Sequence, residues 1–353
     1  MNPDKKKIIV VGAGWGGATF TENIDKTKYD IIMISSSKFV YTPLLTKSAV
    51  FGSPCLESEL STFIIKNTVT DVDLDQKIIY LNNGSSLKGD YLVFAHGAVV
   101  NTFNIEGVDK FCYFINDLYS CEKLYNKIKS LPDHSKVVII GCGPAGVELT
   151  GNLLDLGRFN LYTVDALERP MFNSKQSVSA YVSDFWKHHF VTSYFKKYIS
   201  KIDSKNIIDT KNKTLPYDLA IWCGGNKNNM LTNCVLDKLY IKNKAGIPVD
   251  STFKVTDHVY AIGDCADSGY LKTAQVVSQQ GLHLAKYFNH NFTAPKFTYH
   301  DKGQFCYIGK KQSIYSSKNY FIGGRIAGYL NNFLHIYHAI NYKQKKSFVF
   351  DRK

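Results

Sequence analysis

The stretch VVIIGCGPAGVELTGNLLDLG, residues 137–157, decides how the rest of the chain is interpreted. An apolar run is followed by the turn Gly141-Cys142-Gly143-Pro144-Ala145-Gly146 and then by a helix-like segment. In a strand–turn–helix unit, the first glycine allows a tight turn, the second lets a pyrophosphate approach the backbone, and the third lets helix and strand pack closely. Proline suits a first helical position, where its missing N–H is harmless. The stretch therefore predicts a dinucleotide-binding turn.

The next strand supports this interpretation and indicates which dinucleotide is bound. The segment FNLYTVDA ends at Asp165, about 20 residues after the turn,. An acidic residue at this position holds the two ribose hydroxyls of an adenosine and repels a 2′-phosphate. The second turn is therefore predicted to bind NADH in preference to NADPH.

A similar unit opens the chain, 129 positions earlier (141 − 12), as KKIIVVGAGWGGATFTENI. Gly12, Gly14 and Gly17 match the same spacing, and Gly16 lies between them. Here the second strand, YDIIMISSSKF, reaches Ser35 and carries no acid at its end. A serine can bond a ribose hydroxyl, although less strongly than a carboxylate. We expect two different dinucleotides, a retained FAD at the first turn and an exchangeable NADH at the second.

The predicted fold class is α/β, with two Rossmann-like dinucleotide-binding domains and the NADH domain inserted in a discontinuous FAD domain. The expected boundaries are 1–104 and 245–295 for the FAD domain, 105–244 for the NADH domain, and 296–353 for a small C-terminal membrane-docking or dimerisation segment. The chain is expected to cross between domains near Thr102–Glu106 and Asn243–Gly246.

Composition limits the class of protein. The 353 residues are 44% hydrophobic and 21% charged, which is ordinary for a folded chain and argues against disorder,. The net charge of +13 is compatible with a basic surface, an anionic membrane face or anionic cofactors,. No nucleic-acid-binding motif accompanies it. No apolar run is long enough to predict a membrane-spanning helix, and the chain enters a strand without room for a cleavable leader,.

The eight cysteines form no C-x-x-C pair, so we expect reduced and mostly buried thiols,. Cys142 and Cys265 are interpreted as structural, and Cys55 has no close partner in sequence. This argues against a disulfide reductase and a sulfide:quinone oxidoreductase, because both need a redox cysteine pair.

The ordered motifs GAGWGGATF, YTPLL, DYLVFAHGAVVNTFNIEGV, VVIIGCGPAGVELTGNLLD, VYAIGDCA, TAQVVSQQGLHLAKYFN and KGQFCYIG resemble type II, non-proton-pumping NADH:quinone oxidoreductases of the mitochondrial type. The resemblance runs from about Lys7 to Asp351 and belongs within the two-dinucleotide flavoproteins. It implies hydride transfer from NADH to FAD, then two-electron reduction of a quinone. The resemblance also implies a peripheral membrane protein, which in the resembling branch lies at the mitochondrial inner membrane. A cytoplasmic location is the alternative.

The resemblance also implies roles for individual residues. The cofactor-binding set for FAD comprises Gly12, Gly14, Gly16, Gly17, Ser35, Ala95, Gly97 and Asp264. The set for NADH comprises Gly141, Gly143, Gly146, Asp165, Gly224, Gly225 and Asn226. Gln275, Gln279 and Gln280 are expected to flank the flavin ring and the quinone pocket, and Glu148 is a candidate for orienting the nicotinamide. A first-turn glutamate that merely interacts with the helix dipole is the alternative interpretation of Glu148.

Two positions depart from the family pattern. His96 stands where threonine is usual beside the flavin, and Ser278 stands where many members carry histidine. No metal site is predicted.

Residues 326–340, IAGYLNNFLHIYHAI, place apolar side chains at helical spacing, and the basic run KQKK follows,. The stripe contains Ile326, Tyr329, Leu330, Phe333, Leu334, Tyr337 and Ile340. A membrane-surface helix and a helix packed on its own core or on a homodimer partner both remain open.

Two other functions remain open for the whole chain. One is a soluble NADH diaphorase or other NADH:acceptor reductase. The other is an NADH-sensing flavoprotein related to apoptosis-inducing factors.

Overall fold

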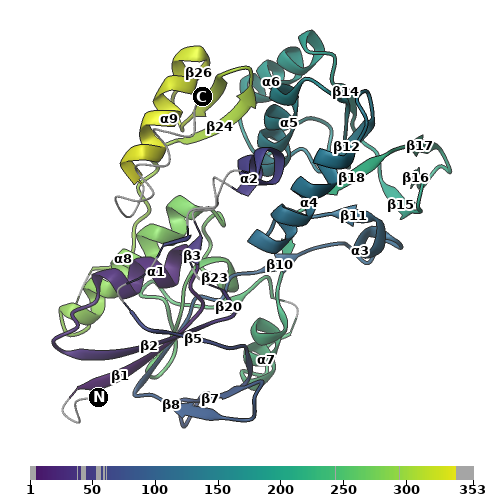
Figure 1. Ribbon diagram of the computed structural model, residues 1–353. Coiled ribbons are helices and arrows are strands. Elements are labelled where there is room, and N and C mark those ends of the chain that lie inside the picture. The colour runs from purple at the N-terminus through teal and green to yellow at the C-terminus, as the bar shows by residue number, and fades with distance from the viewer. Residues whose placement is uncertain are drawn as a thin grey trace. The chain divides into compact units, whose positions relative to one another are not determined.

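The computed structural model describes residues 5–37, 39–40, 45–52, 57–58, 60, 62–242, 244–293 and 295–338 (Figure 1). The chain forms two compact units. The first unit contains Met1–Val40, Glu57–Val99 and Asn226–His300; the second contains Tyr41–Leu56, Val100–Gly225 and Asp301–Lys353.

A sheet of six strands, as far as the structure describes the chain, forms the centre of the first unit in the order β21-β22-β9-β1-β2-β5. Its strands are β1 (Lys6–Val11), β2 (Tyr29–Ser35), β5 (Ile64–Lys66), β9 (Tyr91–Phe94), β21 (Lys254–Thr256) and β22 (Val259–Ala261). All neighbours pair in parallel except β21 with β22. A parallel sheet covered on both faces needs continuous apolar strands, which explains the run Ile8–Val11.

The alternation of side chains along β1 separates the two faces of this sheet. Ile8 and Val10 join one buried cluster with Phe20 and Phe288, while Ile9 and Val11 join another with Leu231,. The first cluster lies under α1 (Trp15–Asn23) and α8 (Ala274–Asn289), which pack side by side in Figure 1. The second lies under α7 (Met230–Lys238) and the antiparallel strands β6 (Val69–Asp73), β7 (Ile78–Leu81) and β8 (Ser86–Lys88).

The second unit contains a parallel sheet whose described strands follow the order β11-β18-β12-β13-β14. They are β11 (Cys112–Tyr113), β12 (Lys136–Ile140), β13 (Asn160–Val164), β14 (Thr192–Tyr194) and β18 (Leu219–Trp222). The helices are α2 (Leu45–Phe51), α3 (Val108–Phe111), α4 (Leu118–Ser130), α5 (Pro144–Leu156), α6 (Gln176–His188) and α9 (Arg325–His338). Two antiparallel sheets complete the unit: β15 (Ile199–Ile202), β16 (Asn206–Asp209) and β17 (Thr214–Pro216), then β24 (Gln304–Gly309), β25 (Gln312–Ser316) and β26 (Phe321–Gly324).

The remaining described elements are short. They are β3 (Phe39–Val40), β4 (Glu57–Ser58), β10 (Val99–Val100), β19 (Asn226–Lys227), β20 (Ile247–Pro248), the 3-10 turn η2 (Gly263–Cys265) and β23 (Ala266–Asp267).

The predicted α/β class with Rossmann-like parallel sheets is confirmed, but the extent of the units differs from the predicted ranges in three places. Residues 41–56 join the second unit, because α2 packs on α4 and α5. Residues 226–244 join the first unit, because α7 packs on β6 and β20. Residues 301–338 join the second unit, because β24 lies along α5. Two of the points at which the chain passes between the units, Val99/Val100 and Gly225/Asn226, lie near the crossings expected at 102–106 and 243–246 but do not coincide with them.

Candidate dinucleotide sites

The glycine turn of the first unit has the geometry that its spacing predicts. Gly12 has a φ of +108°, and a Cβ there would lie 2.3 Å from the carbonyl oxygen of Ala95. A Cβ on Gly17 would lie 2.0 Å from the carbonyl oxygen of Gly12. Around Gly14, in contrast, a Cβ would meet nothing within 4 Å. The outer glycines are therefore required by packing, while the middle one leaves open space at the N-terminus of α1.

The second unit repeats this geometry. Gly141 has a φ of +99°, and its Cβ would lie 2.4 Å from the carbonyl oxygen of Cys223. A Cβ on Gly146 would lie 1.9 Å from the carbonyl oxygen of Gly141, while one on Gly143 would meet nothing within 4 Å. The sheet registers also correspond, since Val11 faces Phe94 and Ile140 faces Trp222. The loops after these strands, 95–97 and 223–225, are therefore equivalent, and Gly97 and Gly225 both have positive φ values of +68° and +104°.

Both helices begin at a glycine, which has no side-chain acceptor that could cap them. Gly14 is the N-cap of α1, and Gly143 is the N-cap of α5, with Pro144 at the next position. Uncapped N–H groups and the positive end of the helix dipole bind phosphate. The open space at Gly14 and Gly143 lies where such a group would approach, so the residues fit the pyrophosphate of a dinucleotide at each turn.

The two turns differ at the end of the adjoining strand. Gly12 and Gly141 donate backbone hydrogen bonds of 2.8 Å to Ile34 and Val164, so the next residues, Ser35 and Asp165, are equivalent. The Asp165 carboxylate accepts hydrogen bonds from the amides of Cys142 at 2.5 Å and Leu167 at 2.8 Å. Ser35 Oγ accepts a bond of 3.3 Å from the amide of Ser37. The Asp165 carboxylate is thus held against the glycine turn, and its remaining lone pairs can accept hydrogen bonds from ribose hydroxyls.

Asp264 follows Gly263 in η2, and burial raises the pKa of its carboxyl. Gln280 fixes this loop: its Oε1 accepts from the amide of Gly263 at 2.8 Å, and its Nε2 donates to Ser268 Oγ at 2.9 Å. Because both polar ends are engaged and the side chain is buried, Gln280 positions the Asp264 loop.

The other two glutamines of α8 bind the chain that follows this helix. Gln275 Oε1 accepts from the Tyr299 hydroxyl at 2.7 Å. The Gln279 amide group donates to the carbonyl of His300 and accepts from its amide, both at 3.0 Å. These contacts hold residues 299–300 against the start of α8.

Glu148 lies beyond the first turn of α5, which contains no acidic residue, so the interpretation as a first-turn glutamate is wrong. Burial raises the pKa of its carboxyl to about 7, against a hydrogen bond from the Thr46 hydroxyl that lowers it. This carboxyl can therefore hold or release a proton near neutral pH.

His96 follows β9 on the loop equivalent to 223–225. Its Nε2 lies 2.9 Å from Thr232 Oγ1 on α7, and burial lowers the pKa of the ring to about 3. The imidazole is therefore neutral at physiological pH. The contact with α7 could not be predicted from the sequence, since Thr232 lies 136 residues away and belongs to no motif.

Among the remaining sequence-predicted residues, Gly224 packs on its own unit, where a Cβ would lie 2.6 Å from the ring of Trp222. Asn226 is exposed on β19. The described cysteines are all free thiols, in line with the expectation of reduced cysteines, and Cys55 lies outside the described residues. Within the described part of the chain, no cluster of three His, Cys, Asp or Glu side chains could hold a metal.

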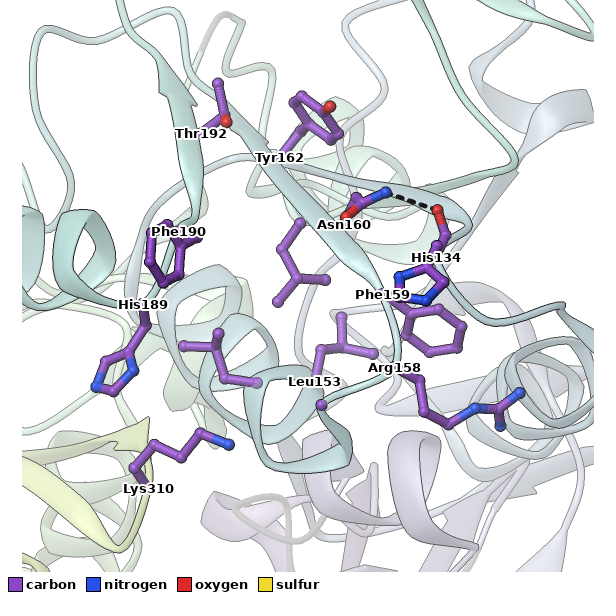
Figure 2. Close-up of a pocket in the computed structure, with 13 residues that line it drawn as sticks. His134, Leu153, Arg158, Phe159, Asn160, Tyr162, His189, Phe190, Thr192 and Lys310 are labelled. Atoms are coloured by element: carbon purple, nitrogen blue, oxygen red, sulfur yellow. Dashed lines mark hydrogen bonds between the residues drawn. The ribbon is translucent and has the colours of Figure 1, made fainter.

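A pocket of about 410 Å³ lies at the other end of α5, away from the glycine turn (Figure 2). It is lined by Leu153 and Gly157 near the end of α5, by Asn160 on β13, and by His189 and Lys310. Asn160 Nδ2 donates to the carbonyl of His134 there. Because α5 begins at Pro144, this pocket is separate from the open space at Gly143.

Comparison with known proteins agrees with this geometry. The pyridine nucleotide-disulphide oxidoreductase family model matches residues 6–281, and the chain belongs to this family. A probable mitochondrial NADH-ubiquinone oxidoreductase of Schizosaccharomyces pombe is 29% identical over 82% of this chain and 63% of its own length. A probable NADH dehydrogenase of Dictyostelium discoideum is 28% identical over 92% of this chain and 83% of its own.

The structure of NDH2 from Plasmodium falciparum in complex with NADH has a TM-score of 0.89 at 24% identity, covering 98% of this chain and 97% of that one. The curated relatives are named as an NADH-ubiquinone oxidoreductase and an NADH dehydrogenase, so the resemblance found in the motifs is confirmed. The chain spans less than two thirds of the length of several curated relatives. It covers 63% and 65% of the length of two fission-yeast proteins.

Proposed function

We propose that this chain is an FAD-dependent NADH:quinone oxidoreductase that does not pump protons. The observation that carries the proposal is the pair of equivalent turns that differ at Ser35 and Asp165. Equivalent turns suit two dinucleotides, and the single acid gives only the second turn a clamp for an adenosine ribose. The names of the curated relatives support NADH as donor and ubiquinone as acceptor.

In the first unit, the backbone around Gly12, Gly14, Gly16 and Gly17 would bind the FAD pyrophosphate, with Ser35 at the ribose. Asp264, on the loop fixed by Gln280, would accept hydrogen bonds from FAD. The Ala95 backbone lies close to the turn, Gly97 takes a positive φ of +68° in the same loop, and the neutral His96 adds no charge there.

In the second unit, Gly141, Gly143 and Gly146 would bind the NADH pyrophosphate, and Asp165 the ribose. Gly224, Gly225 and Asn226 would line the approach of the nicotinamide. Glu148 would orient the nicotinamide and hold a proton near it. Gln275 and Gln279, which hold residues 299–300, would shape the quinone pocket. When bound, FAD supplies the two-electron chemistry that connects a hydride donor to a quinone.

We propose a lipid surface as the partner of α9. Its side chains Ile326, Tyr329 and Phe333 are exposed to 71%, 69% and 66%, and Leu330 and Leu334 are exposed as well. The opposite face packs through Ala327, Gly328 and Asn331, whose Nδ2 donates to Ser313 Oγ at 3.1 Å. A helix that buries its small face and exposes its apolar stripe suits a membrane interface better than a core.

The remaining parts of the C-terminal prediction cannot be placed. Tyr337, Ile340 and the KQKK run lie outside the described side chains. No described helix has the length and apolar character needed to traverse a bilayer. A second copy of the chain on α9 is the competing occupant, and liposome flotation with sedimentation of the lipid-free protein separates the two.

Steady-state turnover tests the activity. NADH oxidation should depend on added short-chain ubiquinone and be much slower with NADPH. If an artificial dye is reduced but no quinone is, the chain is an NADH diaphorase. If every acceptor reacts slowly and NADH changes the oligomeric state, it is an NADH sensor. Either outcome overturns the quinone reductase proposal.

A further inference from the structure

The loop after β9, residues 95–97, lies against the first glycine turn with its backbone. A Cβ on Gly12 would lie 2.3 Å from the carbonyl oxygen of Ala95 and 2.6 Å from the Cα of His96. The amide of Ala95 also donates to the carbonyl of Val11 at 2.8 Å. A displacement of this loop would therefore change the space in which the backbone of Gly12 turns.

The side chain of His96 connects this loop to α7. Its Nε2 lies 2.9 Å from Thr232 Oγ1, and the Thr232 side chain is fully buried. The ring of Phe94 meets the imidazole edge to face, with centroids 5.8 Å apart. The buried Nδ1 has no hydrogen-bond partner among the described residues, so the ring is held by Thr232 and Phe94. We call the pair His96 and Thr232 the loop anchor.

The helix that carries Thr232 is itself fixed in the first unit. Asn229 caps its N-terminus by accepting from the amide of Thr232 at 2.9 Å. Cys234 Sγ donates to the Asp71 carboxylate on β6 at 3.1 Å, and Lys238 Nζ lies 3.4 Å from the same oxygen. Because α7 is held at both ends, Thr232 gives the imidazole a fixed partner.

The equivalent loop of the second unit, residues 223–225, differs at this position. Gly224 stands where the first loop has His96, so no side chain connects the second loop to a helix at this point. The second loop keeps a backbone bond, in which the amide of Asn101 donates to the carbonyl of Gly225 at 2.9 Å. The two loops thus pack on their glycine turns in the same way, but only the first has an anchoring side chain there.

We propose that His96 is a positioning residue, which holds loop 95–97 against the first glycine turn through Thr232 and thereby slows release of the dinucleotide bound there. A cofactor that is retained needs slow release, because the release rate sets its residence time. The loop with Gly224 can shift as a nucleotide enters or leaves, which suits an exchangeable NADH. The inference rests on the proposed function, in which FAD binds at the first turn.

The test compares four variants of the purified holoenzyme. Thr232→Val removes the hydroxyl at nearly constant volume, and Thr232→Ser restores it. His96→Gly gives the first loop the glycine of the second. Cys234→Ala is the control, because it removes a side-chain bond of α7 that does not involve the loop. Thermal unfolding followed by circular dichroism identifies the variants that keep the fold.

Release of FAD is followed by the rise in flavin fluorescence after dilution, at a temperature below unfolding. Thr232→Val and His96→Gly should release FAD about 5-fold faster or more, as expected for the loss of one buried hydrogen bond. Thr232→Ser and Cys234→Ala should release it at the rate of the unmodified protein, and all four should keep their NADH affinity. Unchanged release from Thr232→Val overturns the inference, as does an equal acceleration in Cys234→Ala.

Hydrogen exchange measured by mass spectrometry separates this inference from the proposed function. Thr232→Val should speed exchange in the segment containing residues 95–97 and leave that of 223–225 unchanged, because the anchor restrains only the first loop. If exchange in 95–97 does not change, or if it rises without faster FAD release, the inference is overturned. If the purified protein holds no flavin, the proposed function fails, while the exchange result still decides whether His96 and Thr232 hold the loop.

Discussion

The amide nitrogen of Cys142 lies 2.5 Å from a carboxylate oxygen of Asp165. This contact fixes the acid at the glycine turn, so a nucleotide bound at the turn would meet a carboxylate already in place. Asp165→Asn should weaken NADH binding about 10- to 100-fold, since a hydrogen bond to a charged group contributes about 1.5–3 kcal/mol. The discrimination against NADPH should shrink as well. Calorimetric titration with both nucleotides measures these effects.

The matched control is Ser35→Ala at the equivalent position of the first turn. It should leave NADH affinity unchanged and make FAD easier to remove by dialysis. Loss of NADH affinity in Ser35→Ala, with retention in Asp165→Asn, would reverse the assignment of the two turns.

The glycines of the second turn should separate folding from binding. Gly146→Ala places a Cβ 1.9 Å from the carbonyl oxygen of Gly141, so the turn must shift and the second unit should lose stability. Gly143→Ala meets nothing within 4 Å and should fold normally, yet bind NADH more weakly because its Cβ points into the space for the pyrophosphate. Thermal unfolding and NADH titration of both variants test this, and normal NADH binding by Gly143→Ala would contradict it.

The buried His96 should destabilise the fold at acidic pH. Its pKa is lowered from 6.5 to about 3, so only the unfolded chain takes up the proton between these values. Stability is therefore complete above pH 6.5 and falls as the pH drops, by about 2 kcal/mol at pH 5. His96→Gln keeps a polar contact for Thr232 and should lose this slope. Urea unfolding at pH 5 and pH 7.5 measures it; an unchanged slope would show that the imidazole has the same pKa in the folded and the unfolded chain.

The buried Glu148 carboxyl, in contrast, should stabilise the fold at acidic pH and lose this effect as the pH rises. Its pKa is raised from 4.5 to about 7, so the folded chain retains a proton that the unfolded chain loses. The stabilisation is complete below pH 4.5 and is lost as the pH rises to 7, with an upper limit of about 3 kcal/mol. Glu148→Gln should remove this loss and gain stability relative to the unmodified chain at pH 8. Equal stability of the two proteins at pH 8 would indicate a carboxyl with an ordinary pKa.

The apolar face of α9 should control membrane binding and leave electron entry unchanged. The double variant Tyr329→Asp and Phe333→Asp should reduce flotation with anionic liposomes, because charge replaces apolar area at the interface. NADH should still bleach the flavin at the same rate. Tyr320→Asp, at a position exposed to 70% outside the helix, is the control and should float normally. Full flotation of the double variant would assign the face to another partner.

The sequence predicts the two turns correctly because each depends on local spacing. Gly12 and Gly141 need positive φ, and Gly17 and Gly146 need close packing, wherever they lie in the chain. The limits of the units depend on contacts between distant residues and were missed. Nothing near Leu45–Phe51 indicates that this helix packs on α4 and α5, and nothing near Met230 indicates packing on β6.

The polar network of the candidate site could not be predicted for a similar reason. Thr46 and Asn152, which share a hydrogen bond, are separated by 106 residues, and His96 and Thr232 by 136. The raised pKa of Glu148 follows from burial between elements whose packing the local pattern does not contain. The resemblance gave the position of Glu148, and the fold gives its surroundings.

The central claim is that two equivalent turns hold two different dinucleotides, and an anaerobic titration tests it most directly. The purified protein should carry one flavin per chain, and about one equivalent of NADH should bleach its visible band. Ubiquinone should then restore the band. A protein that binds no flavin, or whose flavin band persists with excess NADH, would contradict the account.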